Sequence, residues 1–195
     1  MNESSSPTTT NGQTGYCELA LGPMFAGKSS WIVRLYKQYT FYTDKIVVIN
    51  YVGDTRYTTQ DLCTHDKTVI PCTQAINLSD VSIPEDVNII LINEGQFFED
   101  IVHWVKEMVD QHKKKVYICG LDGDYKRERF GNLLELVPFC DKVTKLSSLC
   151  GNCKDGTEAI FTHRVTSSKE QVLIGEKDHY LPVCRKCYIY FNKTI

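Results

Sequence analysis

The residues best suited to chemistry begin at Gly22, where Gly-Pro-Met-Phe-Ala-Gly-Lys-Ser matches the pattern G-x-x-x-x-G-K-[ST]. Glycines in such a loop let backbone N–H groups turn inward around a phosphate, and a following helix presents its N-terminus to the anion. A strand-like run precedes the loop and a helix-like run follows it, as this motif requires, although a chance match in a glycine turn is the alternative. We expect Lys28 to reach the β- and γ-phosphates of ATP and the Ser29 hydroxyl to bind Mg²⁺. The predicted nucleotide-binding residues of the loop are Gly22, Pro23, Met24, Phe25, Ala26, Gly27, Lys28 and Ser29.

A second polar group follows the apolar run Val87–Ile92. Ligands of open α/β sheets bind at the carboxyl ends of strands, which is where Asn93 and Glu94 are expected to lie. In such sites the first residue after the strand is commonly a carboxylate, which orients the water shell of the magnesium ion. Asn93 brings no negative charge to this position, so we expect weaker magnesium binding and reduced activity. Glu94 can accept a proton from an attacking hydroxyl, with a helix cap or a salt bridge as the alternative role.

Four of the nine cysteines form two C-x-x-C pairs separated by thirty residues. Four thiolates make a closed structural zinc site, and the long gap implies a loop or hairpin tied at its base by the metal. A redox-active dithiol would not need two pairs. His163 and His179 could replace a ligand, but a solvated or core histidine is the simpler role for each. The predicted zinc ligands are Cys150, Cys153, Cys184 and Cys187.

The elements that must position these groups can be read from the apolar periodicity. Strand-like runs cover Tyr16–Leu21, Lys45–Asn50, Val87–Ile92 and Val116–Leu121, and helical spacing follows the phosphate loop and recurs over residues 99–115. Strands alternating with helices over 16–147 predict an α/β domain with three layers and a parallel sheet. Residues 1–15 are polar and predicted to be a disordered tail. Residues 148–191, with the strand-like runs EAIFTHRV and QVLIG, are predicted to form a small zinc-binding lobe, too small to hold a core without a staple.

The composition excludes several classes of protein. Hydrophobic residues make up 42% of the 195 residues, and the net charge of −2 gives no case for a nucleic-acid-binding surface. No apolar run approaches the roughly 20 residues of a membrane span, and the N-terminus lacks the regions of a signal peptide. We therefore expect a cytoplasmic protein with neither nucleic acid nor membrane as a partner.

Taken in order along the chain, the motifs closely resemble those of the type II thymidine kinases, the zinc-containing enzymes of cells, bacteria and large DNA viruses. The resemblance runs from about Tyr16 to Tyr190 and rests on GPMFAGKSS, DTRY, CTHD, NEGQFF, LDGDYKRERFG, CGNC and QVLIGEKDHYLPVCRKCY. It implies a RecA-like P-loop domain and a zinc-bearing lobe whose lasso loop closes over the nucleoside. It also implies a homotetramer, with dTTP as a candidate feedback inhibitor.

The resemblance further implies the reaction and the residues that perform it. The γ-phosphate of ATP would pass to the 5′-hydroxyl of thymidine, giving dTMP for nucleoside salvage and DNA synthesis. Glu94 would be the general base, Asp54 and Arg56 would lie near the phosphates, with Arg56 stabilising charge on the transferring group, and Asn93 and Gln96 would complete the nucleotide site. The thymidine-binding residues would be Met24, Phe97, Leu121, Tyr125, Phe130, Thr162, Gln171, Val172, Leu173, Ile174, Gly175 and Tyr180.

Three residues depart from the family pattern: Asn93 stands for Asp, Glu176 for a glycine of the lasso, and Tyr125 for Phe. Asn93 is the departure with the largest expected effect. It keeps open the alternative of a nucleotide-binding relative that has lost most catalysis. A zinc-ribbon protein that binds nucleic acid, with an ancillary ATPase, is the other alternative, but Cys150–Cys187 shows no long Lys/Arg run.

Overall fold

A parallel sheet of six strands organises most of the chain. The computed structural model describes residues 14–53, 61–63, 68–172 and 179–193. The strand order is β5-β2-β6-β7-β1-β8, and each neighbouring pair runs parallel. The strands are β1 (Tyr16–Leu21), β2 (Ile46–Tyr51), β5 (Thr73–Ala75), β6 (Ile89–Ile92), β7 (Lys115–Gly120) and β8 (Lys142–Lys145). Because all six run the same way, their carboxyl ends lie at one edge of the sheet.

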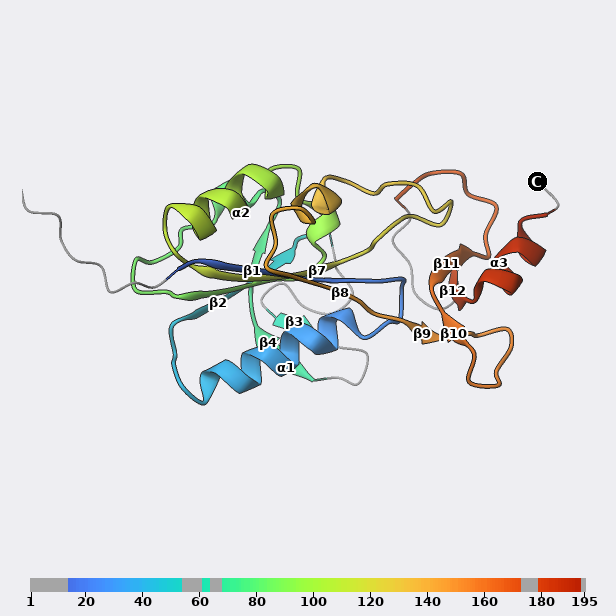
Figure 1. Ribbon diagram of the computed structural model, residues 1–195, viewed down its shortest axis with the longest axis horizontal. Helices are drawn as coiled ribbons and strands as arrows, with labels where there is room; N and C mark the ends of the chain where they lie inside the picture. Colours follow the sequence, from blue (N-terminus) through green and yellow to red (C-terminus); the bar gives the residue numbers. More distant parts are fainter. Residues whose placement is uncertain (1–13, 54–60, 64–67, 173–178, 194–195) are drawn as a thin grey trace, which may run out of the picture.

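Helices cover both faces of this sheet (Figure 1). Helix α1 (Lys28–Thr40) packs on one face together with the hairpin of β3 (Asp61–Cys63) and β4 (Val69–Pro71). Helix α2 (Ile101–Asp110) packs on the other face. Short 3₁₀ turns at Leu78–Asp80, Gly95–Phe97 and Leu133–Leu136 flank these elements.

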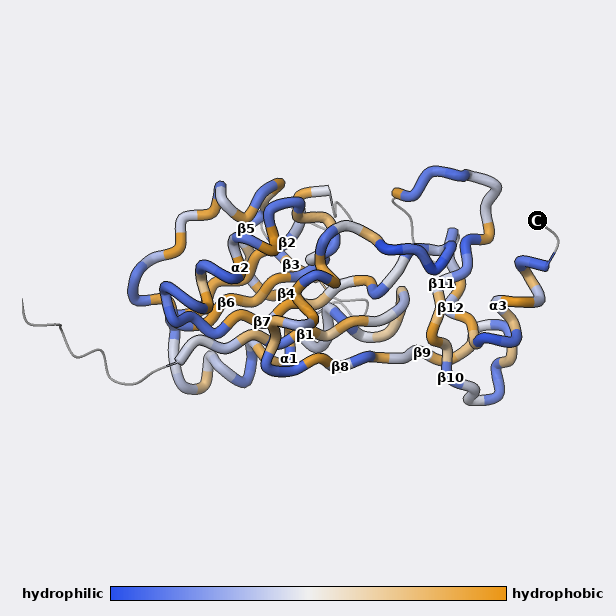
Figure 2. The backbone as a smooth tube through the Cα atoms, turned by 45° about the horizontal axis from the view of Figure 1, so that its top comes forward, coloured by the Kyte–Doolittle hydropathy of each residue, from blue (hydrophilic) through white to orange (hydrophobic). Residues whose placement is uncertain are grey.

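Burial of apolar strand residues holds the layers together. The cluster on the α2 side contains Ile90, Ile118 and Trp104, and the cluster on the α1 side contains Ile32 and Leu91. In Figure 2 the apolar segments concentrate in the strands, while polar segments lie on the outer helix faces and connections. Each helix contributes an apolar stripe at helical spacing, as expected for a three-layer α/β arrangement.

A small lobe lies beyond the carboxyl edge of the sheet (Figure 1) and contains the four cysteines of the two C-x-x-C pairs. We call residues 148–191 the cysteine lobe. Its elements are β9 (Ser148–Leu149), β10 (Glu158–Ala159), β11 (Phe161–Arg164), β12 (Tyr180–Val183) and α3 (Arg185–Phe191). β9 pairs antiparallel with β10, and β11 pairs antiparallel with β12. The lobe has a separate buried cluster, three of whose six buried members are Cys150, Cys184 and Cys187.

The predicted fold class is confirmed: the chain has a parallel sheet in a mixed α/β fold, and a cysteine-bearing lobe. All four predicted strands and both helices form within a few residues of their expected bounds. The domain boundary near residue 147 stays a prediction, and residues 1–13 of the expected tail lie outside the described part of the chain.

Two expectations about strands in the lobe are corrected. EAIFTHRV forms two strands instead of one, because the chain leaves β10 at Ile160 and pairs with a different partner in β11. In QVLIG, Gln171 and Val172 are irregular and the remaining residues lie outside the described part. The antiparallel partner of β11 is Tyr180–Val183, although it contains Pro182. Within the described ranges no helix is long and apolar enough to span a membrane.

Candidate active site and metal centre

The predicted phosphate loop, residues 22–29 and called the phosphate loop below, runs from the end of β1 into the first turn of α1 at the carboxyl edge of the sheet. Gly22 allows close backbone approach, because a Cβ there would lie 2.6 Å from the carbonyl oxygen of Leu146. Gly27 has φ +77°, a left-handed conformation that glycine adopts without strain, and α1 begins at the next residue. The Lys28 side chain is buried and folds back over the loop, where its Nζ donates to the carbonyl of Pro23 at 2.7 Å. The loop thus combines an α-helix N-terminus with a cation, as an anion site requires.

Asn93 lies directly behind this loop, at the end of β6, and is fully buried. Its Oδ1 accepts from the Ser29 hydroxyl at 3.1 Å and from the Cys119 thiol at 3.1 Å. Its Nδ2 donates to Oδ1 of Asn50, on the neighbouring strand β2, at 2.8 Å. Burial raises the pKa of Cys119 to about 12, so this thiol remains a donor. Both polar atoms of the Asn93 side chain are therefore hydrogen-bonded, and its amide N–H makes a contact that a carboxylate could not.

Glu94 follows with a strained backbone, φ +56°, and faces the cavity described below. Non-glycine residues rarely adopt this conformation, and such strain clusters at functional sites. The Nε2 group of Gln96 donates to Oε2 of Glu94 at 2.7 Å, while its Oε1 accepts from the backbone N–H of Leu121 at 3.0 Å. Gln96 is buried and therefore fixes the Glu94 carboxylate relative to the ends of β6 and β7.

Aromatic rings form an apolar wall beside Glu94. The ring of Tyr51, at the end of β2, stacks on Phe97 with centroids 4.8 Å apart, and Phe97 meets Phe130 edge-on at 5.2 Å. On the opposite side the cysteine lobe contributes Thr162, whose Oγ1 accepts from the backbone N–H of Met24 at 3.0 Å. That bond joins the lobe directly to the phosphate loop.

These groups surround a cavity of about 260 Å³. Its size and mixed lining suit a small molecule that has an apolar part and a few polar contacts. The sequence-predicted residues that line it are Met24, Phe25, Ala26, Gly27, Lys28, Ser29, Glu94, Gln96, Phe97, Leu121, Tyr125, Phe130, Thr162, Gln171, Val172 and Tyr180. Sequence positions more than 150 residues apart thus meet at one site.

Other predicted residues lie elsewhere. Gly22, Pro23 and Asn93 are buried behind the cavity lining, where they support it. Asp54, Arg56, Leu173, Ile174, Gly175 and Glu176 lie outside the described residues. Of the predicted residues that do line the cavity, Thr162 and Tyr180 belong to strands β11 and β12.

Six lining residues were missed by the sequence argument: Ser30, Tyr51, Gly53, Gly123, Asp124 and Arg164. Tyr51 and Gly53 follow a predicted strand, so the carboxyl-end rule could have found them. Arg164 carries no such signal, because its place in the cavity depends on the pairing of β11 with β12.

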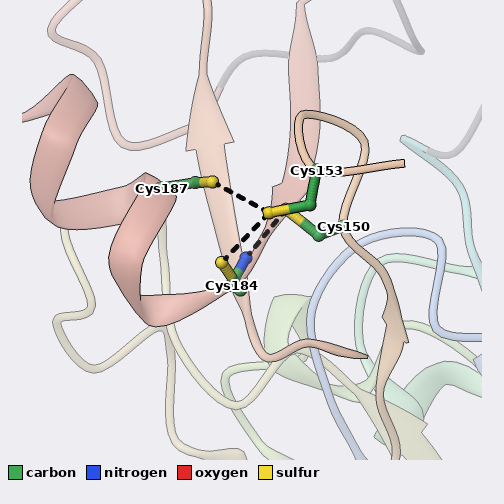
Figure 3. A group of neighbouring side chains, drawn as sticks. All are labelled: Cys150, Cys153, Cys184 and Cys187. Carbon is green, nitrogen blue, oxygen red and sulfur yellow. Dashed lines mark hydrogen bonds between the residues drawn. The ribbon is translucent and has the colours of Figure 1, made fainter. Parts of the chain in front are cut away.

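The four cysteines of the two C-x-x-C pairs meet at one point (Figure 3). Their sulfur atoms all lie within 4.8 Å of one another, and the Sγ of Cys153 lies 3.8 Å from that of Cys184 and 3.4 Å from that of Cys187. Tetrahedral zinc with Zn–S bonds of about 2.3 Å requires sulfur separations of about 3.8 Å, so the group fits this metal. Among the described residues it is the one cluster of three or more metal-ligating side chains with such geometry.

The surroundings of the sulfurs also favour a cation. Desolvation opposes ionisation of Cys150, but N–H groups of Cys153, Cys184 and Asn152 outweigh it and lower the pKa of the Cys150 thiol to about 6. The pKa of Cys153 is raised to about 12, chiefly by its contact with Cys187. The Cys153 thiol therefore stays protonated beside a Cys150 thiolate unless a cation compensates both charges. His163 lies apart from this cluster: its ring stacks on Phe191 with centroids 4.8 Å apart, and burial lowers its pKa.

Comparison with known proteins identifies the family. A family model described as thymidine kinase matches residues 15–188. The chain is 41% identical to the thymidine kinase of myxoma virus (strain Uriarra) and 42% identical to that of vaccinia virus (strain Western Reserve), each over 177 residues. Both alignments cover 90% of this chain and 97% of the relative.

The chain belongs to the thymidine kinase family.

Membership confirms the resemblance inferred from the motifs and bears on the alternatives. The match includes both the sheet and the cysteine lobe, so the lobe is an integral part of this thymidine kinase family fold. A nucleic-acid-binding zinc ribbon with an ancillary ATPase is thereby disfavoured. The individual roles of the cavity residues remain predictions.

Proposed function

We propose that this chain transfers the γ-phosphoryl group of ATP to the 5′-hydroxyl of thymidine, giving ADP and dTMP. The observation that carries the proposal is a single cavity lined both by the phosphate loop and by the aromatic wall, with Glu94 between them. A phosphate donor and an apolar base can then bind end to end at one site. The family relationship supports the same reaction.

On the phosphate side, catalysis consists of positioning and charge stabilisation. The helix N-terminus at α1 and the Lys28 ammonium would hold the phosphates. The Ser29 hydroxyl is an oxygen donor of the kind Mg²⁺ prefers, and Asn93 Oδ1 orients it from behind. When bound, Mg²⁺ would supply charge neutralisation at the transferring phosphate. Arg56 and Asp54 are proposed near the phosphates on the resemblance alone.

On the nucleoside side, Glu94 is proposed to accept the proton of the 5′-hydroxyl as the oxygen attacks phosphorus. Its carboxylate is held by the Gln96 amide, which fixes its orientation toward the cavity where the substrate would bind. Phe97 and Phe130 would contact the thymine ring and its methyl group. Backbone N–H and C=O groups of residues 171–175 would form hydrogen bonds with the polar edge of the base.

A steady-state assay with Mg·ATP and a panel of nucleosides tests the proposal. We expect thymidine to be phosphorylated with a higher kcat/KM than deoxycytidine, since the unmatched polar edge of the wrong base costs binding energy. Binding of ATP without phosphoryl transfer to any pyrimidine nucleoside would contradict the proposed function. That result would favour the relative that has lost catalysis.

A homotetramer and feedback inhibition by dTTP are proposed from the family resemblance, and a cytoplasmic location is proposed from the sequence. Analytical ultracentrifugation of the zinc-loaded protein tests the first, with a single species at four times the chain mass of 22.3 kDa expected. Inhibition of the assay by dTTP, competed by ATP, tests the second. Fluorescence microscopy of a tagged chain tests the third.

A further inference from the structure

Arg164 occupies an unusual position for an arginine, because it is 95% buried while it lines the cavity. It is the last residue of β11. One terminal nitrogen donates to the backbone carbonyls of Ser168, at 3.3 Å, and Glu170. The other donates to the carbonyl of Gln171 at 3.0 Å and to the Tyr180 hydroxyl at 2.6 Å. One side chain thus fixes three carbonyls of the segment 165–172 and one side chain of β12.

The same guanidinium also contacts the other side of the cavity. Its central carbon lies 3.8 Å from the ring centroid of Tyr125, within the range of a strong cation–π contact. The Tyr125 hydroxyl donates to the carbonyl of Lys169 at 3.0 Å. Gln171 Nε2 donates to Oδ2 of Asp124 at 3.0 Å. Arg164 therefore lies at the centre of a contact between the loop 121–130, which follows β7, and the segment 165–172 of the cysteine lobe.

We propose that Arg164 is a positioning residue for the nucleoside: it shapes the segment 165–172 and orients Tyr125 and Tyr180 around the base side of the cavity. The inference rests on the proposed function, since it assigns that side of the cavity to the nucleoside. Arg164 acts through Tyr125, Tyr180 and the loop carbonyls. The phosphate side, built on α1 and β6, shares none of these hydrogen bonds.

The chemistry of the contacts explains why an arginine stands here. Two separate terminal nitrogens donate in diverging directions while the flat group stacks on a ring, a combination that a lysine ammonium cannot reproduce. The Nε–H meets no acceptor among the described residues, so the fixing of the loop depends entirely on those terminal nitrogens. Lysine at this position would keep the charge but lose the two separate terminal nitrogens and the planar stack on the Tyr125 ring.

The test is calorimetric titration of the zinc-loaded protein with thymidine, and separately with an ATP analogue, for Arg164→Met and Arg164→Lys. Methionine keeps an unbranched apolar stem. Arg127→Met is the matched control, because the Arg127 guanidinium lies 4.3 Å from the Tyr188 ring but is exposed and does not line the cavity. Zinc content and the thermal midpoint are measured for every variant, so that a loss of folding is distinguished from a loss of positioning.

We expect Arg164→Met to weaken thymidine binding about tenfold or more, with nucleotide affinity and zinc content unchanged. Arg164→Lys should lie close to Arg164→Met, and Arg127→Met close to the parent. Unchanged thymidine affinity in Arg164→Met would overturn the proposal. So would an equal loss of both ligands accompanied by loss of zinc, since that result indicates a merely structural role.

Failure of the proposed function gives a different result. If the parent binds another nucleoside but not thymidine, the reaction is wrong, and the same variants titrated with that nucleoside still test Arg164. If the parent binds the ATP analogue but no nucleoside, the assignment of Arg164 is overturned as well.

Discussion

The carboxyl edge of the sheet and the cysteine lobe meet at one cavity, but different forces hold them in shape. The sheet edge rests on two large apolar clusters, so the phosphate loop and Glu94 are positioned by ordinary hydrophobic burial. The lobe has six buried residues in its cluster, and half of them are cysteines of the metal centre. A small unit of this kind requires a metal or another staple. The phosphate loop and Glu94 are thus positioned by the core of the sheet, whereas the residues that the cysteine lobe contributes to the cavity are predicted to depend on a metal held by the four cysteines.

Removal of zinc with a strong chelator tests most directly whether different forces stabilise the two regions. Structural zinc contributes on the order of 10 kcal/mol in small zinc domains, so the lobe should loosen while the sheet stays folded. Both tryptophans, Trp31 and Trp104, lie on the sheet domain, so their fluorescence should remain native. Hydrogen exchange should rise in the lobe strands β9 to β12 and in α3, and should stay unchanged in the sheet. Unchanged protection of those strands after verified zinc loss would contradict the expectation.

Glu94→Gln separates chemistry from positioning at the sheet edge. Glutamine keeps the shape of the side chain but cannot accept the proton, so kcat should fall by about 10²- to 10⁴-fold while nucleotide binding is retained. Glu99→Gln, at an exposed position, is the control and should match the parent. Turnover retained in Glu94→Gln would mean that another group is the base.

A matched pair of valine truncations compares the two regions directly. Val116 in β7 and Val183 in β12 are both fully buried. Val116→Ala should lower the free energy of unfolding of the sheet domain by about 2 kcal/mol, from lost burial and the cavity left behind. Val183→Ala should leave the tryptophan-monitored urea transition unchanged and instead speed zinc release to a chelator. Equal shifts of that transition would show that the two regions unfold as one unit.

Asn93→Asp is expected to have a modest effect and tests how residue 93 acts at the sheet edge. A carboxylate there would attract Mg²⁺, but it would lose the donor that Asn93 offers to Asn50 Oδ1. Without magnesium we expect the free energy of unfolding, measured in urea, to fall by about 1 kcal/mol. The loss stays this small because the Asn50 amide can turn and donate to the new carboxylate. The magnesium concentration needed for tight nucleotide binding should fall. An unchanged magnesium requirement would show that residue 93 acts only by orienting Ser29.

Much of the sheet domain was predictable from sequence because its strands are continuous apolar runs and its helices have clear stripes. The sequence did not predict β8, because two of the four residues in KVTK are lysines. This segment is a strand because it pairs with the edge of β1. The same applies to β12, where Pro182 argues against a strand. Edge pairing of this kind depends on a neighbour that local sequence does not specify.

The sequence by itself determined the family, and it indicated the glycine-rich loop and the four cysteines that could hold zinc, because these motifs are residue types at fixed short spacings. Only the tertiary structure decided what surrounds them. The Asn93–Asn50 hydrogen bond, the hydrogen bond from the Leu121 backbone to Gln96 and the place of Arg164 all join groups on different strands or loops. Such contacts follow from strand order and from the docking of the lobe on the sheet, which are set by packing over the whole chain and leave no local signature.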